Sequence, residues 1–365
     1  MSRFVRLCEI SSPTGEERAV ADAVRSELEG FGLAVTEDDA ARRTVAGAGN
    51  LLARIPGKAG KSVMFCAHLD TVPHEGPVRV VLDDEGVYRS AGDTILGADN
   101  KAAVAVLLEL ASRHSAEPPP VGIELLFTVA EEQGLLGAAA FDMSVLESDT
   151  GFVLDHASAI GEVITAAPTH MRIRAEFKGV EAHAGIRPEE GRSAVVAAAK
   201  AVSAMELGRI DEGTTANIGL IEGGSSGNVV AGRCRLLGEA RSTDPDRATT
   251  LIAAMSDQLV WAASEAGCEV DIVTERVFPG YRVPDGSIAL EIAEAALTSR
   301  GHSPKRISTG GGSDANVFIA GGMDCVLLAN GTWENHTADE WVARKDLAGM
   351  LEVCEAVLAE VSARC

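Results

Sequence analysis

The sequence contains no CxxC pair, although seven cysteines are spread along its 365 residues. An odd number of cysteines without paired spacing does not form the framework of a disulfide-stapled secreted domain. Several lie in apolar, strand-like runs, such as Cys66 in VMFCAH and Cys325 in MDCVLLA, where a buried free thiol is expected. Their spacing is also not that of thiolate metal ligands. We therefore expect a protein of a reducing compartment.

Long apolar runs and basic residues are scarce as well. No window reaches 18 consecutive apolar residues, and the N-terminal segment MSRFVRLCEISSPTGEE lacks the apolar core of a signal peptide. There are 32 basic and 54 acidic residues, which gives a formal net charge of −22. Such a surface repels phosphate backbones and favours solubility. These absences predict a cytoplasmic protein that binds neither membranes nor nucleic acid.

The composition is that of a folded chain, with 46% hydrophobic and 24% charged residues. A length of 365 residues suggests about two domains, at roughly 150 residues each. The first part alternates helical patterns with short, nearly continuous apolar strands. The expected helices are 16–29 and 101–112, and the expected strands are 51–55, 63–67, 123–129 and 152–154. Buried strands separated by helices predict an α/β domain with a mainly parallel sheet.

The pattern changes near residue 165. In HMRIRAEFKG apolar and charged residues alternate, which predicts a strand with one wet face. The order strand, helix, strand, strand, helix, strand follows, and it is typical of a split βαβ layout. We expect an inserted α+β domain at 165–278. The α/β pattern resumes afterwards, so the larger domain is predicted to be discontinuous, with residues 1–164 and 279–365.

Acidic residues and histidines follow the predicted strands or open a predicted helix: His68, Asp70, Asp99, Glu131, Glu132 and Asp155. Taken singly, each has a plain explanation, such as a polar loop or, for Asp99, a helix N-cap. His336, in NGTWENHTADEWV, is by itself an ordinary loop histidine. The carboxyl ends of parallel strands meet at one edge of a sheet, however, and that edge is where sites are built. We therefore expect these side chains to converge.

Two adjacent acids after a buried strand, Glu131 and Glu132, are costly to desolvate unless a dication lies beside them. The two can also diverge, so that one binds metal while the other handles protons. A set rich in oxygen, with two histidines and no cysteine, suits a catalytic dinuclear zinc site. The sequence therefore predicts two Zn²⁺ ions, with Mn²⁺ or Co²⁺ as substitutes.

Several motifs, in this order, resemble the M20 metallopeptidase family, which includes tripeptide aminopeptidases, carboxypeptidases, aminoacylases and desuccinylases. The motifs GADNKAAVA, TVAEEQGLLGA, EAHAGIRPEEGRSAV and GGGSDANVF are most similar to its peptidase T-like branch. The resemblance covers essentially the whole chain. It implies a zinc-exopeptidase-type catalytic domain carrying an inserted lid or dimerisation domain. It also implies that His68 and Asp155 hold one zinc, that Glu132 and His336 hold the other, and that Asp99 bridges both.

The same resemblance implies further roles around the metals. Asp70 would orient His68, and Glu131 would be the general base that takes a proton from the attacking water. The bond between Asp99 and Asn100 is often cis in this family.

In the insert, His183 of EAHAG matches a histidine that stabilises the oxyanion and, in dimers, comes from the partner subunit. Asn228 in SSGNVVAG matches a substrate-contacting asparagine, although Ala231 replaces the proline of that pattern. Arg282 is a candidate carboxylate clamp, based on its rough position alone. A homodimer through the insert is therefore an expectation.

Three functions remain open at this point. One is exopeptidase cleavage of short peptides, of the tripeptide or dipeptide aminopeptidase kind. Another is hydrolysis of N-acyl amino acids, as a deacylase or desuccinylase on the same site. The third is a non-catalytic metal-binding protein, which has no need of an uncoordinated base such as Glu131. The preferred end of a peptide and its side chains are not determined by these motifs.

Overall fold

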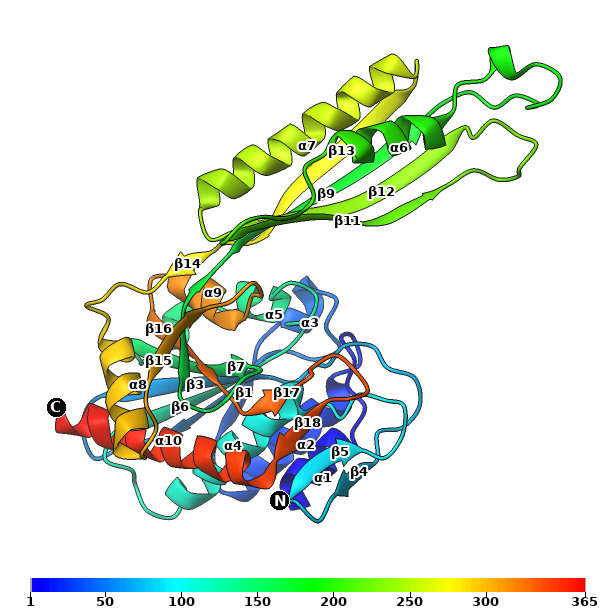
Figure 1. Ribbon diagram of the computed structural model, residues 1–365. Coiled ribbons are helices and arrows are strands. Elements are labelled where there is room, and N and C mark those ends of the chain that lie inside the picture. The colour runs from blue at the N-terminus through cyan, green and yellow to red at the C-terminus, as the bar shows by residue number, and fades with distance from the viewer. Residues whose placement is uncertain (1, 365) are drawn as a thin grey trace. The chain divides into compact units, whose positions relative to one another are not determined.

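The computed structural model describes residues 2–364. Its internal contacts divide the chain into two compact units (Figure 1). Unit 1 consists of Met1–Ala166 and Arg282–Cys365, and unit 2 of Ala167–Tyr281. Each unit has its own sheet and its own helices, which agrees with an α/β part interrupted by an α+β part.

Unit 1 is built on a nine-stranded sheet with the order β1-β2-β6-β3-β7-β16-β8-β14, in which β15 also pairs with β8. The strands are β1 (Val35–Glu37), β2 (Leu51–Ile55), β3 (Ser62–His68), β6 (Gly122–Thr128), β7 (Thr150–His156), β8 (Glu162–Ala167), β14 (Tyr281–Arg282), β15 (Lys305–Ser308) and β16 (Asp324–Ala329). The central strands β6, β3, β7 and β16 are parallel, whereas β2 runs antiparallel to β6 and β8 runs antiparallel to β16. β15 pairs with β8 in parallel. The prediction of a mainly parallel sheet is confirmed.

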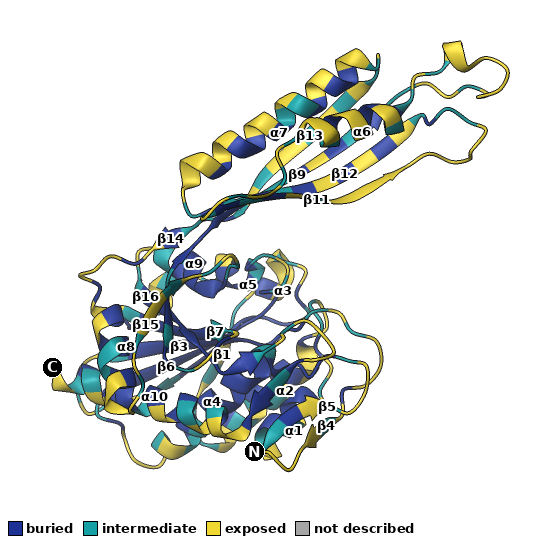
Figure 2. Ribbon diagram, in the orientation of Figure 1, coloured by how far each residue is buried: buried dark blue, intermediate teal, exposed yellow. Residues whose placement is uncertain are grey.

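Helices pack around this sheet and bury it. They are α1 (Ser2–Cys8), α2 (Arg18–Gly30), α3 (Ala40–Arg43), α4 (Ala98–His114), α5 (Leu136–Ala140), η1 (Met143–Val145), α8 (Ile288–Ser299), α9 (Asp314–Ala320) and α10 (Arg344–Ala363). Every residue of β6 is buried, and most of α4 is buried as well (Figure 2). α4 contacts α1, α10 and β3. Because it is covered on several sides, its buried residues are mostly alanine, valine and leucine.

A small four-stranded sheet in unit 1 was not predicted. It has the order β17-β18-β5-β4, with β4 (Val80–Leu82), β5 (Val87–Ser90), β17 (Thr332–Trp333) and β18 (Trp341–Ala343). All of its pairs are antiparallel. Strands this short contain too few residues to show an alternating pattern. The sheet matters because the loop between β17 and β18 carries His336.

Unit 2 is a five-stranded antiparallel sheet with the order β10-β11-β12-β9-β13. Its elements are β9 (Thr169–Lys178), η2 (Pro188–Glu190), α6 (Ala194–Ala204), β10 (Gly208–Asp211), β11 (Thr214–Gly223), β12 (Arg233–Ser242), α7 (Pro245–Glu265) and β13 (Glu269–Phe278). The expected alternation in β9 is confirmed, because Ile173, Ala175 and Phe177 are buried while Arg174 is exposed. The buried residues pack with α6 and α7, so one face of this sheet stays open.

Local sequence explains where the helices of unit 2 begin. The Ser193 hydroxyl accepts a hydrogen bond from the Val196 amide and caps α6. Asp244 caps α7, and Pro245 occupies its first turn, where no amide donor is needed.

The described cysteines are all free thiols, and most are buried, as expected; Cys365 lies outside the described residues. In residues 2–364 no helix combines the length and the apolar character needed to cross a membrane.

Candidate metal centre

The predicted site residues of unit 1 meet at the carboxyl edge of its parallel strands. His68 is the last residue of β3, Asp155 lies at the end of β7, and Glu131 and Glu132 follow β6. Asp99 comes from the first turn of α4. The β17–β18 loop adds His336, which has a left-handed backbone with φ of 67°.

Asp99 lies between the two histidines. Its Oδ1 is 3.3 Å from Nε2 of His68, and its Oδ2 is 3.1 Å from Nε2 of His336. His68 Nε2 is also 3.3 Å from Oδ1 of Asp155, and His336 Nε2 is 3.0 Å from Oε1 of Glu132. The carboxylate of Asp99 thus faces two separate nitrogen–carboxylate pairs, one on each side.

The donor atoms fit cations. Two groups of three donors have all their ligand atoms within 4.8 Å of one another, namely His68, Glu131 and Asp155, and His68, Asp99 and Glu132. His336 belongs to neither group, and Glu131 belongs to one, so this grouping differs from the ligand pairs that the resemblance implies. Oε1 of Glu132 is buried and makes no hydrogen bond, although the ring of His336 is near it. A buried carboxylate oxygen without a donor is what a cation would satisfy.

The pKa shifts of these residues indicate that the site contains too little positive charge to balance its carboxylates. Burial, reinforced by Asp99, raises the pKa of Asp155 to about 7. Burial, followed by the charge of Asp155, raises the pKa of Glu131 well above its usual range. The hydrogen bond with Asp99, followed by the neighbouring carboxylate of Glu132, raises the pKa of His336 to about 10. Within residues 2–364, no lysine or arginine forms an ion pair with these four carboxylates. Hard cations would supply the missing charge.

Asp70 is fully buried and holds two parts of the site. Its backbone carbonyl is 2.9 Å from Nδ1 of His68, and its carboxylate is 3.5 Å away. The carboxylate also accepts hydrogen bonds from the amides of Glu131 (3.0 Å) and Glu132 (3.2 Å) and from the hydroxyl of Thr14 (2.7 Å). The carbonyl therefore makes the closer contact with the imidazole, and the carboxylate fixes the turn that follows β6.

The turn that presents Asp99 has an unusual backbone. Gly97 has a φ of 73°, Asp99 and Asn100 are not helical, and the peptide bond between the latter two is cis, as the resemblance implied. The side-chain amide of Asn100 donates a 3.0 Å hydrogen bond to Asp155. Asp99 is thereby connected to the end of β7 through its neighbour.

Glu340, which the sequence patterns did not single out, anchors this turn. Its carboxylate accepts hydrogen bonds from the amides of Gly97 (2.7 Å) and Asp99 (2.8 Å), and only 1% of the residue is exposed. Glu340 is on the same β17–β18 loop as His336. The loop that carries one candidate ligand is therefore hydrogen-bonded to the turn that carries another. An acid shortly after the histidine, directly before the apolar run of β18, was the available signal.

Asp314, in GGGSDAN, is a second buried acid that the sequence patterns did not single out. It opens α9, and its Oδ2 accepts a 2.5 Å hydrogen bond from the hydroxyl of Thr128 at the end of β6. Its Oδ1 is buried and has no hydrogen-bond partner within the described part of the chain. Burial raises its pKa to about 6. This carboxyl adds negative charge at the same edge of the sheet.

The three residues predicted to contact the substrate or the oxyanion, His183, Asn228 and Arg282, do not belong to the cluster of acids and histidines described above. In unit 2, His183 forms an isolated β-bridge with Val229, and the Ala184 amide donates to the carbonyl of Asn228 at 2.9 Å. The loops of His183 and Asn228 are thus side by side, and both residues are exposed. In unit 1, Arg282 is exposed on β14, and β16 and β8 separate that strand from β7. Its strand is therefore not among those that carry the acids.

Comparisons with known proteins give one consistent result. A family model described as peptidase family M20/M25/M40 matches residues 64–360. The uncharacterized protein YqjE of Bacillus subtilis is 37% identical over 364 residues, which cover 99% of this chain and 98% of that protein. The crystal structure of the aminopeptidase PepT from Bacillus cereus has 36% identity and a TM-score of 0.87, covering 99% and 97% of the two chains. A tripeptidase from Staphylococcus aureus has 35% identity and a TM-score of 0.93, covering 100% and 98%.

Proposed function

The chain belongs to the peptidase family M20/M25/M40, and on this premise we propose that it is a metal-dependent hydrolase that removes residues from the ends of short peptides. The observation that carries the proposal is the cluster at the carboxyl edge. Two overlapping groups of three donor atoms lie within 4.8 Å of one another there, and Nε2 of His336 is 3.1 Å from Asp99 and 3.0 Å from Glu132. The similarity to an aminopeptidase and a tripeptidase supports peptides, and tripeptides in particular, as substrates.

We propose two Zn²⁺ ions at this edge, replaceable by Mn²⁺ or Co²⁺. His68 and Asp155 would hold one, Glu132 and His336 would hold the other, and Asp99 would bridge them. The two oxygens of Asp99 each face a different histidine, which supports a bridging role. When bound, such ions lower the pKa of a water molecule toward neutrality and polarise the amide carbonyl.

The protein's own groups would then handle the proton. Glu131 is the proposed general base, because it lies beside Asp155 and His68, and Asp70 fixes its backbone amide. It would take a proton from the attacking water and deliver it to the leaving nitrogen, so that the amine departs neutral. Asp70 would hold the imidazole of His68 and the turn of Glu131 in fixed positions relative to each other. Proton transfer then needs no movement of the backbone.

Unit 2 would act as the lid or dimerisation domain. His183 would stabilise the oxyanion, and Asn228, on the adjoining loop, would contact the substrate. Arg282 would bind a substrate carboxylate, although its strand lies apart from the acids within the sheet order. We also propose a homodimer through unit 2, and a cytoplasmic location, which agrees with the free thiols.

A peptide panel on the zinc-reconstituted protein tests this function. The panel contains one tripeptide with both ends free, with the amine acetylated and with the carboxyl amidated. We expect cleavage of the free tripeptide and of its amide, and loss of cleavage on acetylation. Cleavage of the acetylated form would instead show a deacylase or a carboxypeptidase. No cleavage of any peptide by metal-loaded protein would contradict the proposal.

A further inference from the structure

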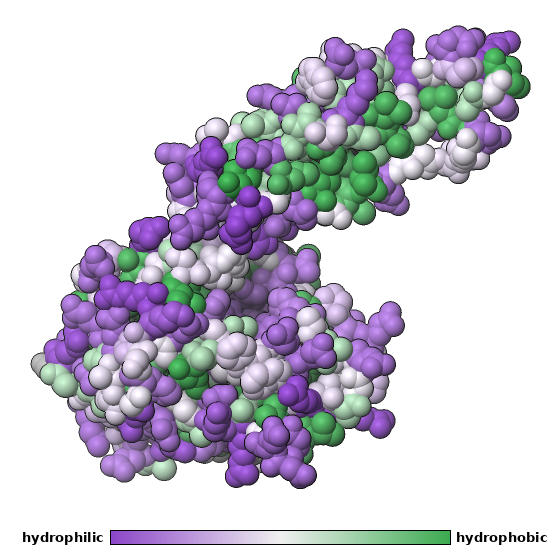
Figure 3. All heavy atoms as spheres, viewed as in Figure 1, coloured by the Kyte–Doolittle hydropathy of each residue, from purple (hydrophilic) through white to green (hydrophobic). Residues whose placement is uncertain are grey.

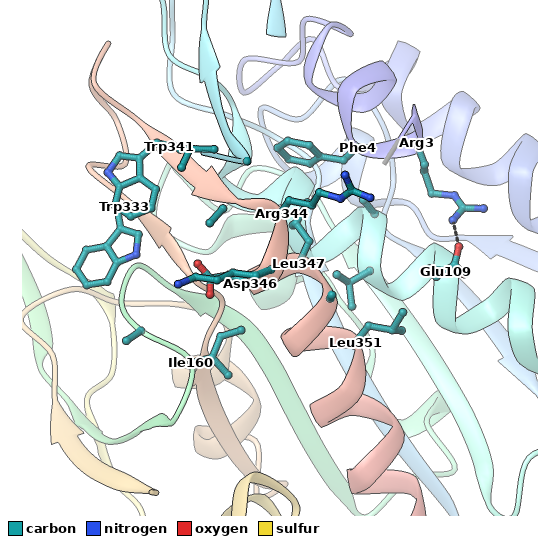
Figure 4. A pocket seen from close by; sticks show the side chains of 18 of the residues that line it. Arg3, Phe4, Glu109, Ile160, Trp333, Trp341, Arg344, Asp346, Leu347 and Leu351 are labelled. Atoms are coloured by element: carbon teal, nitrogen blue, oxygen red, sulfur yellow. Dashed lines mark hydrogen bonds and ion pairs between the residues drawn. The ribbon is translucent and has the colours of Figure 1, made fainter. Parts of the chain in front are cut away.

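Unit 1 contains a cavity of about 1050 Å³ that is separate from the candidate metal ligands. It is lined by α1, the middle of α4, the first half of α10, the small sheet and the loop after β7 (Figure 4). None of the proposed metal ligands lines it. The volume is slightly above the range of about 300–1000 Å³ that is typical of small-molecule sites.

The walls are apolar and aromatic. Phe4, Leu347 and Leu351 contribute to them, and the rings of Trp333 and Trp341 stack with centroids 5.7 Å apart and planes 12° from parallel. Both tryptophans are half-buried. An aromatic pair of this kind offers flat apolar contact area to a ligand. The cavity is therefore suited to an apolar chain or ring.

Its charged residues are four basic ones, Arg3, Arg113, Arg344 and Lys345, and three acidic ones, Glu85, Glu109 and Asp346, in a chain whose net charge is −22. Arg3 and Arg113 both form ion pairs with Glu109. By contrast, Arg344 and Lys345, at the start of α10, are exposed, and neither has an ion-pair partner among residues 2–364. Two free cations beside an apolar wall are complementary to an anion with an apolar tail.

We propose that this cavity binds an amphipathic carboxylate, with its carboxylate on Arg344 and Lys345 and its apolar part against the Trp333–Trp341 pair. The tryptophans also give the cavity a connection to the catalytic edge. Trp333 ends β17, Trp341 begins β18, and the loop between them carries His336 and Glu340. A ligand that holds the indole pair would hold this loop, so occupancy should change metal affinity. This second part rests on the proposed metal role of His336.

Tryptophan fluorescence measures binding directly. The chain has three tryptophans, and Trp261→Phe leaves the two that line the cavity. Octanoate, octylamine and octanol are titrated into this variant after the metals have been removed with a chelator, so that the probe cannot bind a metal. We expect saturable quenching by octanoate, with at least about tenfold weaker binding of the amine and the alcohol.

Variants locate the site. Arg344→Ala combined with Lys345→Ala should weaken octanoate about tenfold, and Ala348→Phe, which fills the cavity, should weaken it through a different residue. Lys200→Ala, an exposed lysine on α6, is the matched control and should change nothing. Thermal melts verify that each variant is folded. Equal binding of octanoate and octylamine, absence of quenching by octanoate, or binding unchanged in both cavity variants would overturn the proposal.

The connection to the catalytic edge has its own readout. Zinc is titrated into the metal-free protein with and without saturating octanoate. We expect the zinc affinity of the weaker site to change at least about threefold, and to be unaffected in the Arg344→Ala, Lys345→Ala protein. Unchanged zinc affinity with octanoate bound would overturn the coupling. Because octanoate binding is measured without metal or substrate, its failure is distinct from a failure of the proposed peptidase activity.

Discussion

The acidic side chains on the sheet of unit 2 and those at the carboxyl edge of unit 1 differ in their ion-pair partners. On the open face of the unit 2 sheet, acids face bases across neighbouring strands. Glu275 is 2.8 Å from Arg172 and 2.7 Å from Arg174, and Lys178 pairs with Asp271. At the carboxyl edge of unit 1, the carboxylates of Asp99, Glu131, Glu132 and Asp155 form no ion pair with a lysine or arginine of the described chain, and their ion-pair partners there are two histidines. Figure 3 shows that apolar side chains gather over the middle of unit 2, with hydrophilic side chains around them.

This difference distinguishes surface acids, which keep the protein soluble, from buried acids, which are candidates for a catalytic role. A cross-strand ion pair on a wet face is complete as it stands and contributes little to stability. Buried carboxylates without a base are costly, and a fold retains them where something binds. The buried acids at the carboxyl edge of unit 1 therefore indicate bound cations, and the paired acids on the sheet of unit 2 do not. Substitutions in the two places should have very different effects.

The largest effect is expected at Glu131. Glu131→Gln keeps the shape of the side chain but removes the proton acceptor, so kcat for a tripeptide should fall by about 10²–10⁴. Steady-state kinetics, with metal content measured on the same sample, test this. Near-normal kcat with both metals bound would show that Glu131 is not the base.

Substitution of Glu340 should have a smaller effect, because this residue positions the metal ligands and does not itself react. Glu340→Ala leaves two buried amides without their acceptor and frees the loop of His336, so metal affinity should fall by about 10–100-fold. Glu340→Gln can still accept one of the two hydrogen bonds and should restore part of that affinity. Zinc titration of both variants is the measurement. If both bind zinc like the unmodified chain, Glu340 does not position the site.

In unit 2, Glu239 offers a test by pH. Its hydrogen bonds with His170 and then Arg241 lower its pKa from 4.5 to about 2. A lowered folded-state pKa stabilises the fold above the unfolded pKa, and this contribution is lost as pH falls toward 2. The Tm of Glu239→Gln should therefore be below that of the unmodified chain at pH 6, and the difference should shrink between pH 4.5 and 2. A constant difference would rule out this ionisation as the cause.

The smallest effect is expected at Glu275. Glu275→Gln removes the ion-pair partner of Arg172 and Arg174 at the surface and should lower the free energy of unfolding by at most about 1 kcal/mol. Activity and zinc content should not change. Denaturant unfolding and the tripeptide assay supply both values, and this variant is the matched control for Glu131→Gln. Loss of bound zinc in Glu275→Gln would break the distinction between the two regions.

Much of this arrangement was predictable from sequence patterns. Apolar strands such as β3 and β6 are continuous and buried, and parallel strands end at one edge, so the meeting of His68, Glu132 and Asp155 follows from topology. His336 was a different case, since a lone loop histidine has no pattern, and only the family resemblance singled it out.

Glu340 and Asp314 were missed for a physical reason. Each is held by hydrogen bonds from segments far away in the sequence, Glu340 by the amides of Gly97 and Asp99 and Asp314 by the hydroxyl of Thr128. Tertiary packing creates such contacts, and no local periodicity encodes them. The short strands of the small sheet were missed because pairing, rather than alternation, defines them.

The metal content of the reconstituted chain tests the central claim most directly. After dialysis against zinc and removal of the excess, elemental analysis should find two zinc ions per chain, and Asp99→Ala should retain at most one. The unmodified chain should cleave a free tripeptide, and removal of the zinc should abolish that cleavage. Tripeptide cleavage that persists in fully metal-free protein would contradict the claim that the acids at this edge hold catalytic cations.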